Sequence, residues 1–199
     1  MTNTSLDPAD YLQCCEVIDW QTPSVLRLSS TLAGDDTCYT TVAKRCFDWV
    51  RDNIRHSLDY QLNPVTCRAS DVLTHRTGYC YAKSHLLSAL LRANQIPAGL
   101  CYQRLSVDGM GPPFCLHGMT AVFLPDIGWY RSDPRGNRDD VDAQFTPPLE
   151  QLAFRTTLQH ECDLPDIHRR PLAVVVDALQ THNTWDALLA NLPDVSQLS

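Results

Sequence analysis

The distribution of apolar residues changes at Pro97. Before it, they recur at helical spacing over 36–54 and 79–93. After it, short apolar runs are separated by glycine and proline turns, which is typical of strands. Helices followed along the chain by an antiparallel sheet form the α+β class, and we expect that class here. The predicted strands are 98–105, 116–124 and 129–133.

Shorter elements flank this pattern. Residues 22–24 mark a helix start, and residues 70–71 are expected to cap a short helical turn. The apolar residues of 172–179 fit a helical face, although three consecutive valines also suit a strand. A last short helix is expected to begin at 183–184.

The 199 residues, 44% hydrophobic and 20% charged, suit one folded domain. A chain of this size buries roughly 70% of its unfolded surface, so it can form a core without disulfides or metals. We expect a single domain over 1–199, with a core at about 37–137 between a helical lead-in and a mixed C-terminal tail.

Several classes of partner are not expected. The net charge of -7 and the scattered basic residues argue against nucleic acid. No apolar run reaches the roughly 20 residues of a membrane span. Residues 1–10 are polar and acidic, unlike a secretory signal, which predicts a cytoplasmic location. The sequence leaves the oligomeric state open.

The nine cysteines do not form the pattern of a disulfide framework. Their number is odd, no Cys-x-x-Cys occurs, and their share lies below the roughly 8–10% of disulfide scaffolds. We expect most of them to be free thiols packed as small apolar side chains. A functional cysteine must therefore be identified by its surroundings.

Cys80 has such surroundings. It lies at the start of the predicted helix 79–93, and we expect Gly78 to allow a tight entry into that helix. The helix dipole and the free N–H groups of a first turn favour a thiolate over a thiol. Cys80 is thus a candidate nucleophile, with a buried structural cysteine as the alternative.

His117 and Asp133 lie on the two strands of one predicted hairpin. Side chains alternate between the faces of a strand, so the loop length decides whether the two residues meet. A two-residue turn would place them on opposite faces. A five-residue loop over 124–128 pairs Phe123 with Trp129 and places Asp133 on the face of His117, one diagonal step away. A surface or core histidine and a turn aspartate are the alternatives.

Longer motifs surround these residues. They are Arg-Thr-Gly-Tyr-Cys-Tyr-Ala-Lys (76–83), Leu-Leu-Arg-Ala-Asn-Gln-Ile-Pro-Ala (90–98), His117 and Gly-Trp-Tyr-Arg-Ser-Asp-Pro (128–134). Together they resemble the core of the transglutaminase-like superfamily, which includes animal transglutaminases, peptide N-glycanases and bacterial proteins of cysteine-protease type. The resemblance covers roughly half of the chain and keeps the order Cys, His, Asp.

The resemblance implies a papain/transglutaminase-like core in which the nucleophile helix packs on an antiparallel β-sheet. It implies Cys80 as nucleophile, His117 as general base and acid, and Asp133 as the residue that orients the imidazole. We expect no cofactor and no metal, and no stretch has the pattern of a calcium loop. Many relatives have a small residue and then tryptophan after the histidine. Here Gly118 and Met119 follow it, which weakens the expectation of an aromatic wall and of acyl transfer to amines.

Several residues are candidates for substrate binding. Tyr79, Tyr81 and Tyr102 are candidate pocket walls, although aromatic residues at such places more often belong to the core. Arg135 and Asn137 lie in the loop after the last predicted strand and are candidate substrate contacts, with a solvated loop as the alternative.

These features indicate a thiol enzyme that cleaves or transfers at amide bonds through a cysteine acyl-enzyme, with hydrolysis favoured. A peptide, a protein or a small amide would each fit as substrate. One alternative is an inactive binding module with the same fold. The other is a metal site that uses Cys101, Cys115 and His117 with residues 160–162, although no pair has the short spacing of structural zinc sites.

Overall fold

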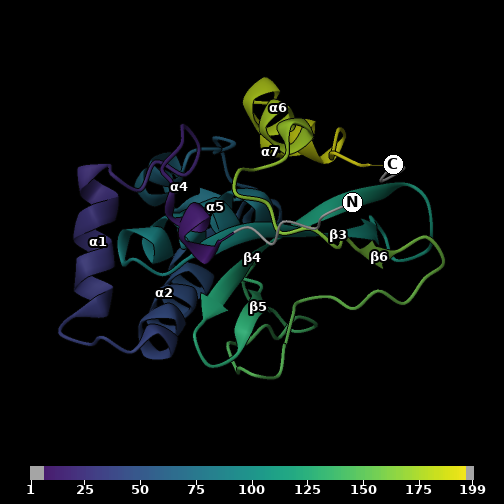
Figure 1. Cartoon of the computed structure of the whole chain (residues 1–199). Coiled ribbons are helices and arrows are strands. Elements are labelled where there is room, and N and C mark those ends of the chain that lie inside the picture. The colour runs from purple at the N-terminus through teal and green to yellow at the C-terminus, as the bar shows by residue number, and fades with distance from the viewer. Residues whose placement is uncertain (1–6, 196–199) are drawn as a thin grey trace.

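The computed structural model describes residues 7–195. Helices occupy the first half of the chain, the antiparallel sheet follows, and a segment with two short helices comes last (Figure 1). The structure thus has the predicted α+β arrangement. The helices are η1 (Pro8–Leu12), α1 (Pro23–Ala33), α2 (Tyr39–Asn53), α3 (Ser57–Tyr60), α4 (Ala69–His75), α5 (Cys80–Ala93), α6 (Ala173–Thr181) and α7 (Trp185–Leu189). The strands are β1 (Arg55–His56), β2 (Thr77–Gly78), β3 (Ala98–Ser106), β4 (Phe114–Leu124), β5 (Gly128–Ser132) and β6 (Cys162–Asp163).

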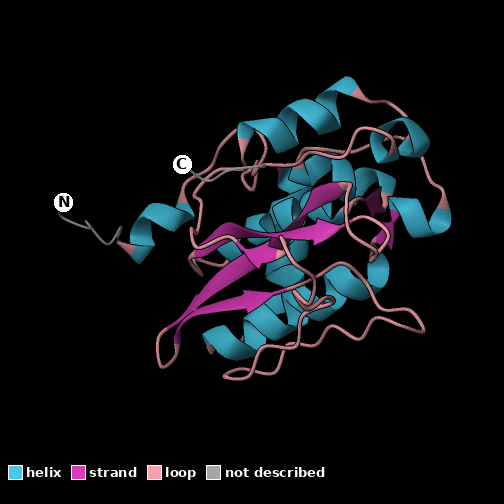
Figure 2. Ribbon diagram, turned by 90° about the vertical axis from the view of Figure 1, so that its right-hand side faces the viewer, coloured by secondary structure: helices cyan, strands magenta, loops and turns pink. Residues whose placement is uncertain are grey.

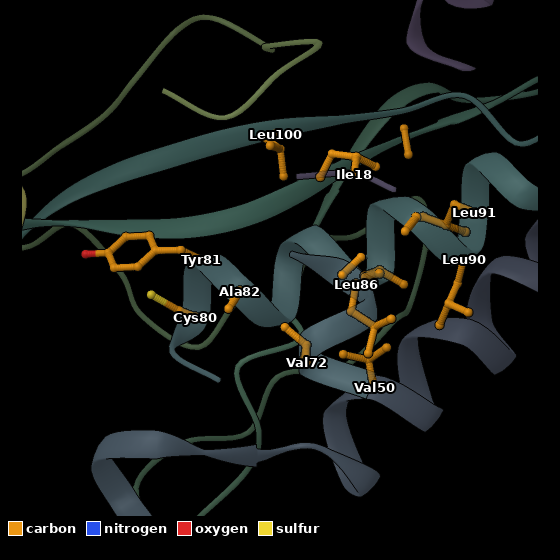
Figure 3. Packing of buried hydrophobic residues seen from close by; sticks show 14 of the residues in the cluster. Ile18, Val50, Val72, Cys80, Tyr81, Ala82, Leu86, Leu90, Leu91 and Leu100 are labelled. Atoms are coloured by element: carbon orange, nitrogen blue, oxygen red, sulfur yellow. The ribbon is translucent and has the colours of Figure 1, made fainter. Parts of the chain in front are cut away.

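Helix α5 is the central element of the fold. Helices α1, α2 and α4 pack against it, and strands β3 and β4 also contact it. Figure 3 shows Val50 of α2, Val72 of α4 and Leu100 of β3 around the leucines of α5. Every residue from Cys80 to Arg92 is buried, including the leucines at 86, 87, 90 and 91, which belong to the apolar spacing noted over 79–93. Each such leucine contributes about 1.5–3 kcal/mol by its burial, so helix α5 is held firmly.

Two charged residues of α5, Lys83 and Arg92, are buried as well, and main-chain carbonyls accept their hydrogen bonds. Lys83 donates to the carbonyls of Arg51 and Ile54 at the end of α2, and Arg92 donates to the carbonyl of Ala98 at 2.8 and 3.0 Å. Burial lowers the pKa of the Lys83 ammonium to about 7. These bonds tie both ends of α5 to neighbouring segments.

Two predicted helix starts are shifted. α2 begins at Tyr39 because the Asp36 carboxylate accepts the N–H of Cys38 at 2.9 Å and holds the preceding residues in a turn. Ser70 lies inside α4, and its hydroxyl donates to Asp19 at 2.5 Å instead of capping the helix, so the cap predicted there is wrong.

The main sheet has the strand order β5-β4-β3-β6 (Figure 1), and its strands are magenta in Figure 2. β4 pairs with β5 in antiparallel register, with Phe123 opposite Trp129 as the longer predicted loop required. Leu124 and Gly128 pair as well, so three residues form the turn, and Gly128 has a φ of 88° that favours glycine. The odd loop length keeps Asp133, the residue after β5, on the face of His117.

A short parallel ladder of β1 and β2, not predicted from the sequence, lies beside the start of helix α5. Arg55 pairs with Thr77, and His56 pairs with Gly78. Both strands end where a helix begins, β1 at α3 and β2 just before α5. The ladder thereby places the side chain of His56 next to the start of α5.

The C-terminal segment covers one side of this arrangement. Residues 173–181 form helix α6, which decides between the helix and the strand that the sequence left open. Beyond α7, the carbonyl of Pro193 accepts the N–H of Leu116 on β4 at 2.7 Å. None of the helices within residues 7–195 is long and apolar enough to cross a membrane.

All nine cysteines are free. Four of them are buried, three are partly exposed and two are exposed, so the expected apolar packing holds for only part of the set.

Candidate active site

Cys80 is the first residue of α5 and is 7% exposed (Figure 3). Its own N–H therefore has no partner inside the helix. β5 ends opposite Thr120, so the N–H of Gly118 further along β4 is not used by β5 and instead donates to the Cys80 sulfur at 3.4 Å. The sulfur thus lies between the N-terminus of a helix and the edge of a strand.

Glycine is required at two places for these segments to approach. A Cβ on Gly118 would lie 2.9 Å from Cδ1 and 3.0 Å from Cα of Tyr81. A Cβ on Gly78 would lie 3.0 Å from Cβ of Ala82 and 3.2 Å from Oγ1 of Thr66. Gly78 has no left-handed φ, so close packing rather than backbone freedom explains it.

His117 and Asp133 are in direct contact. The imidazole Nε2 lies 2.6 Å from Oδ2 of Asp133, which is fully buried. Asp133 also accepts the N–H of Arg135 at Oδ1 and the N–H of Ala153 at Oδ2, both at 3.1 Å. Three donors therefore fix the carboxylate, and the carboxylate fixes the ring.

The charges of this pair follow from its burial and its neighbours. Burial lowers the pKa of His117, but the charges of Asp133 and Cys80 and the hydrogen bonds to both raise it to about 10. Burial raises the pKa of Asp133, but the His117 charge and the three hydrogen bonds outweigh this and hold the pKa below its usual value. An imidazolium beside a carboxylate is therefore the favoured state at neutral pH.

Cys80 and His117 line the same cavity, which has a volume of about 630 Å³. Since Nε2 of His117 is bound to Asp133, Nδ1 is the ring nitrogen left for the sulfur. The arrangement can hold a thiolate against an imidazolium, which is the charged form of a thiol nucleophile.

Phe154 is a part of this site that the sequence did not predict. Its ring meets His117 edge to face, with centroids 5.1 Å apart and planes at 83°, and it lies 5.4 Å from the Arg135 guanidinium. Met119, two residues after His117, is buried with Cys101 and Ala121 and does not contribute to this wall. The aromatic contact thus comes from a distant segment that carries no periodic or motif signal.

Some of the residues predicted to contact substrate line the cavity, and others do not. Tyr79, Tyr81 and Arg135 line it, with each tyrosine hydroxyl donating to a main-chain carbonyl. Tyr102 does not line it: its side chain is buried in the core, so this prediction is corrected. On β3 it pairs with Gly118, and its hydroxyl accepts a hydrogen bond from the main chain of the tail.

The loop after Asp133 is held by its own ion pairs and hydrogen bonds. Arg135 binds Asp59 through two bonds of 2.7 and 2.8 Å. Asn137 does not line the cavity, and its bonds to Asp142 and Ala143 brace the loop.

The residues considered for a metal site are not brought together. Cys101 is buried in an apolar cluster, and His117 is bound to Asp133. Within residues 7–195 there is no group of three His, Cys, Asp or Glu side chains that could hold a metal ion.

Comparison with solved structures gives a similar fold. A protein from Cytophaga hutchinsonii described as a putative cysteine protease is 22% identical, with a TM-score of 0.52, over 66% of this chain and 43% of that one. The periplasmic domain of TgpA from Pseudomonas aeruginosa is 20% identical, with a TM-score of 0.47, over 65% of this chain and 48% of that one. The match thus spans less than half the length of either structure.

A search of curated proteins gave no match. The family model of the transglutaminase-like superfamily matches residues 27–134, a range that contains Cys80, His117 and Asp133. Because this range is more than half of the chain, the protein belongs to the transglutaminase-like superfamily.

Proposed function

We propose that this protein is a thiol enzyme that acts on amide bonds through an acyl-enzyme on Cys80. His117 is the general acid and base, and Asp133 orients its ring. The observation that carries this proposal is the 2.6 Å contact between Nε2 of His117 and the buried Asp133 carboxylate, in the cavity that Cys80 also lines. Membership of the family supports the class of chemistry.

The reaction begins with the thiolate and the imidazolium. The Cys80 sulfur attacks the substrate carbonyl carbon and forms a C–S bond, while the carbonyl oxygen takes the negative charge. The free N–H of Cys80 is placed to donate to that oxygen. His117 then gives its proton to the leaving nitrogen, the C–N bond breaks, and a thioester remains.

Release of the acyl group uses His117 as a base. The neutral imidazole takes a proton from water, the water oxygen attacks the thioester carbon, and the C–S bond breaks to leave a carboxylic acid. We favour hydrolysis for two reasons. The second residue after His117 is Met119 and not a tryptophan, and one fold neighbour is described as a putative cysteine protease. A peptide, a protein or a small amide is the proposed substrate class.

Electrophilic probes that mimic amides test this proposal. Intact mass spectrometry after incubation should find one rapid adduct on the wild type and none on Cys80→Ala. Cys38→Ala is the matched control, since this thiol is exposed and lies at the start of another helix. The Cys38→Ala variant should form the adduct on Cys80 at the wild-type rate. A probe that labels Cys80→Ala as fast as the wild type would contradict the proposal.

A further inference from the structure

His56 lies next to the proposed nucleophile but outside the Cys-His-Asp set. It is the last residue of β1 and pairs with Gly78, two residues before Cys80. Its side chain is 5% exposed and lines the cavity together with Cys80 and His117. Its ring meets that of Tyr79 edge to face, with centroids 5.5 Å apart.

Hydrogen bonding separates His56 from the other buried polar side chains of the cavity. The hydroxyls of Tyr79 and Tyr81 donate to carbonyls, His117 is bound to Asp133, and Arg135 is bound to Asp59. Within the described part of the chain, no hydrogen-bond partner is found for either ring nitrogen of His56. The ring therefore keeps a hydrogen-bonding capacity that a ligand atom can use.

The two ring nitrogens of His56 differ in their surroundings. Nδ1 is fully buried and lies 3.6 Å from the Asp59 carboxylate, beyond hydrogen-bond distance. That carboxylate is already bound to Arg135 and Arg138. Nε2 is not among the buried unpartnered atoms, so it is the nitrogen with access to the cavity.

The surroundings also keep the ring uncharged. Burial lowers the pKa of His56 well below its usual value, and the positive charges of Arg135, Lys83 and His117 lower it further. A neutral imidazole carries one N–H, which can polarise a carbonyl without transferring a proton to it.

We infer that His56 donates from Nε2 to the substrate carbonyl oxygen and, with the N–H of Cys80, stabilises the oxyanion formed when the sulfur attacks. This inference rests on the proposed function, because it concerns the same reaction. It assigns the second donor that acyl transfer through a tetrahedral intermediate needs.

Two reactions of Cys80 separate this role from a structural one. Alkylation by iodoacetamide displaces iodide at a saturated carbon and forms no oxyanion. Acylation by 4-nitrophenyl acetate forms a C–S bond, passes through an oxyanion and releases 4-nitrophenolate. His56→Leu should therefore lower the acylation rate about 10²–10³-fold, the usual effect of losing one oxyanion donor, and leave the alkylation rate close to wild type.

Two further variants identify the donating nitrogen. The amide nitrogen of glutamine reaches the place of Nε2, so His56→Gln should recover much of the acylation rate. The shorter asparagine reaches only the place of Nδ1, so His56→Asn should stay close to His56→Leu.

The outcomes are distinguishable. If His56→Leu is acylated at the wild-type rate, the inference is wrong. It is also wrong if alkylation and acylation slow equally in all three variants, because that result indicates a structural role. A wild type whose Cys80 is neither alkylated rapidly nor acylated would instead refute the proposed function, and the role of His56 with it.

Discussion

His117 is buried between a carboxylate and a thiol, and this position determines its charge. Burial alone would favour the neutral ring, but the charges of Asp133 and Cys80 and the hydrogen bonds to them raise its pKa to about 10. A histidine that stays protonated at neutral pH can act as the general acid in the first step that we propose.

The raised pKa of His117 predicts a pH dependence of stability. The folded state holds this proton up to about pH 10, whereas an unfolded histidine loses it near 6.5. The resulting stabilisation is complete below about pH 6.5 and is lost as the pH rises towards 10. The free energy of unfolding of the wild type, minus that of His117→Asn, should therefore fall over this range by up to about 1.4 kcal/mol per pH unit.

Urea unfolding at several pH values measures this difference. Lys83, whose pKa is lowered to about 7, titrates in the same range, but it is present in both proteins and its contribution largely cancels. A difference that does not change with pH would contradict a protonated His117.

Phe154 is expected to position His117 and to limit the access of water to it. Phe154→Leu keeps apolar volume but removes the ring edge that meets the imidazole. Aromatic pairs contribute about 0.5–1.5 kcal/mol beyond their burial, so the acylation rate of Cys80 should fall about 2–10-fold. Phe123→Leu, in which the lost partner is Trp129, is the control and should leave that rate unchanged. Equal rates in both variants would show that Phe154 has no positioning role.

Among the elements, β4 brings the parts of the site together. Its odd positions carry His117 on one face, and Gly118 turns a main-chain N–H towards the first residue of α5. This is possible because β5 ends opposite Thr120, so the N–H of Gly118 is left for Cys80 before the tail binds the same edge of β4 at Leu116. The end of β5 therefore leaves room for the Cys80 sulfur.

Gly118→Ala tests this contact between β4 and α5. The added Cβ would lie 3.0 Å from Cα of Tyr81, so the strand and the helix must move apart. Overpacking of this kind costs about 1–3 kcal/mol, which chemical unfolding can measure, and the alkylation rate of Cys80 should fall with it. Unchanged stability and unchanged reactivity would contradict the close approach seen here.

At the scale of the whole molecule, the sequence predicted what depends on local periodicity. Helix α5 follows from apolar spacing. The sequence left the loop between β4 and β5 open, and only an odd loop length, which the structure has, brings Asp133 to the face of His117. The ladder of β1 and β2 has two residues per strand, too short for a pattern. Phe154 and the pairing of Asp59 with Arg135 depend on contacts between distant segments. Tyr102 was misassigned because only its pairing with β4 shows which way it points.

The pH dependence of Cys80 alkylation by iodoacetamide tests the central claim most directly. An ordinary thiol has a pKa near 8.5, and its rate falls about tenfold for each pH unit below that value. The exposed Cys162 provides an internal comparison, followed by peptide mass spectrometry. We predict that Cys80 still reacts rapidly at about pH 6, where Cys162 is slow, and that His117→Asn removes this difference. A Cys80 rate that falls in parallel with that of Cys162 would contradict the account.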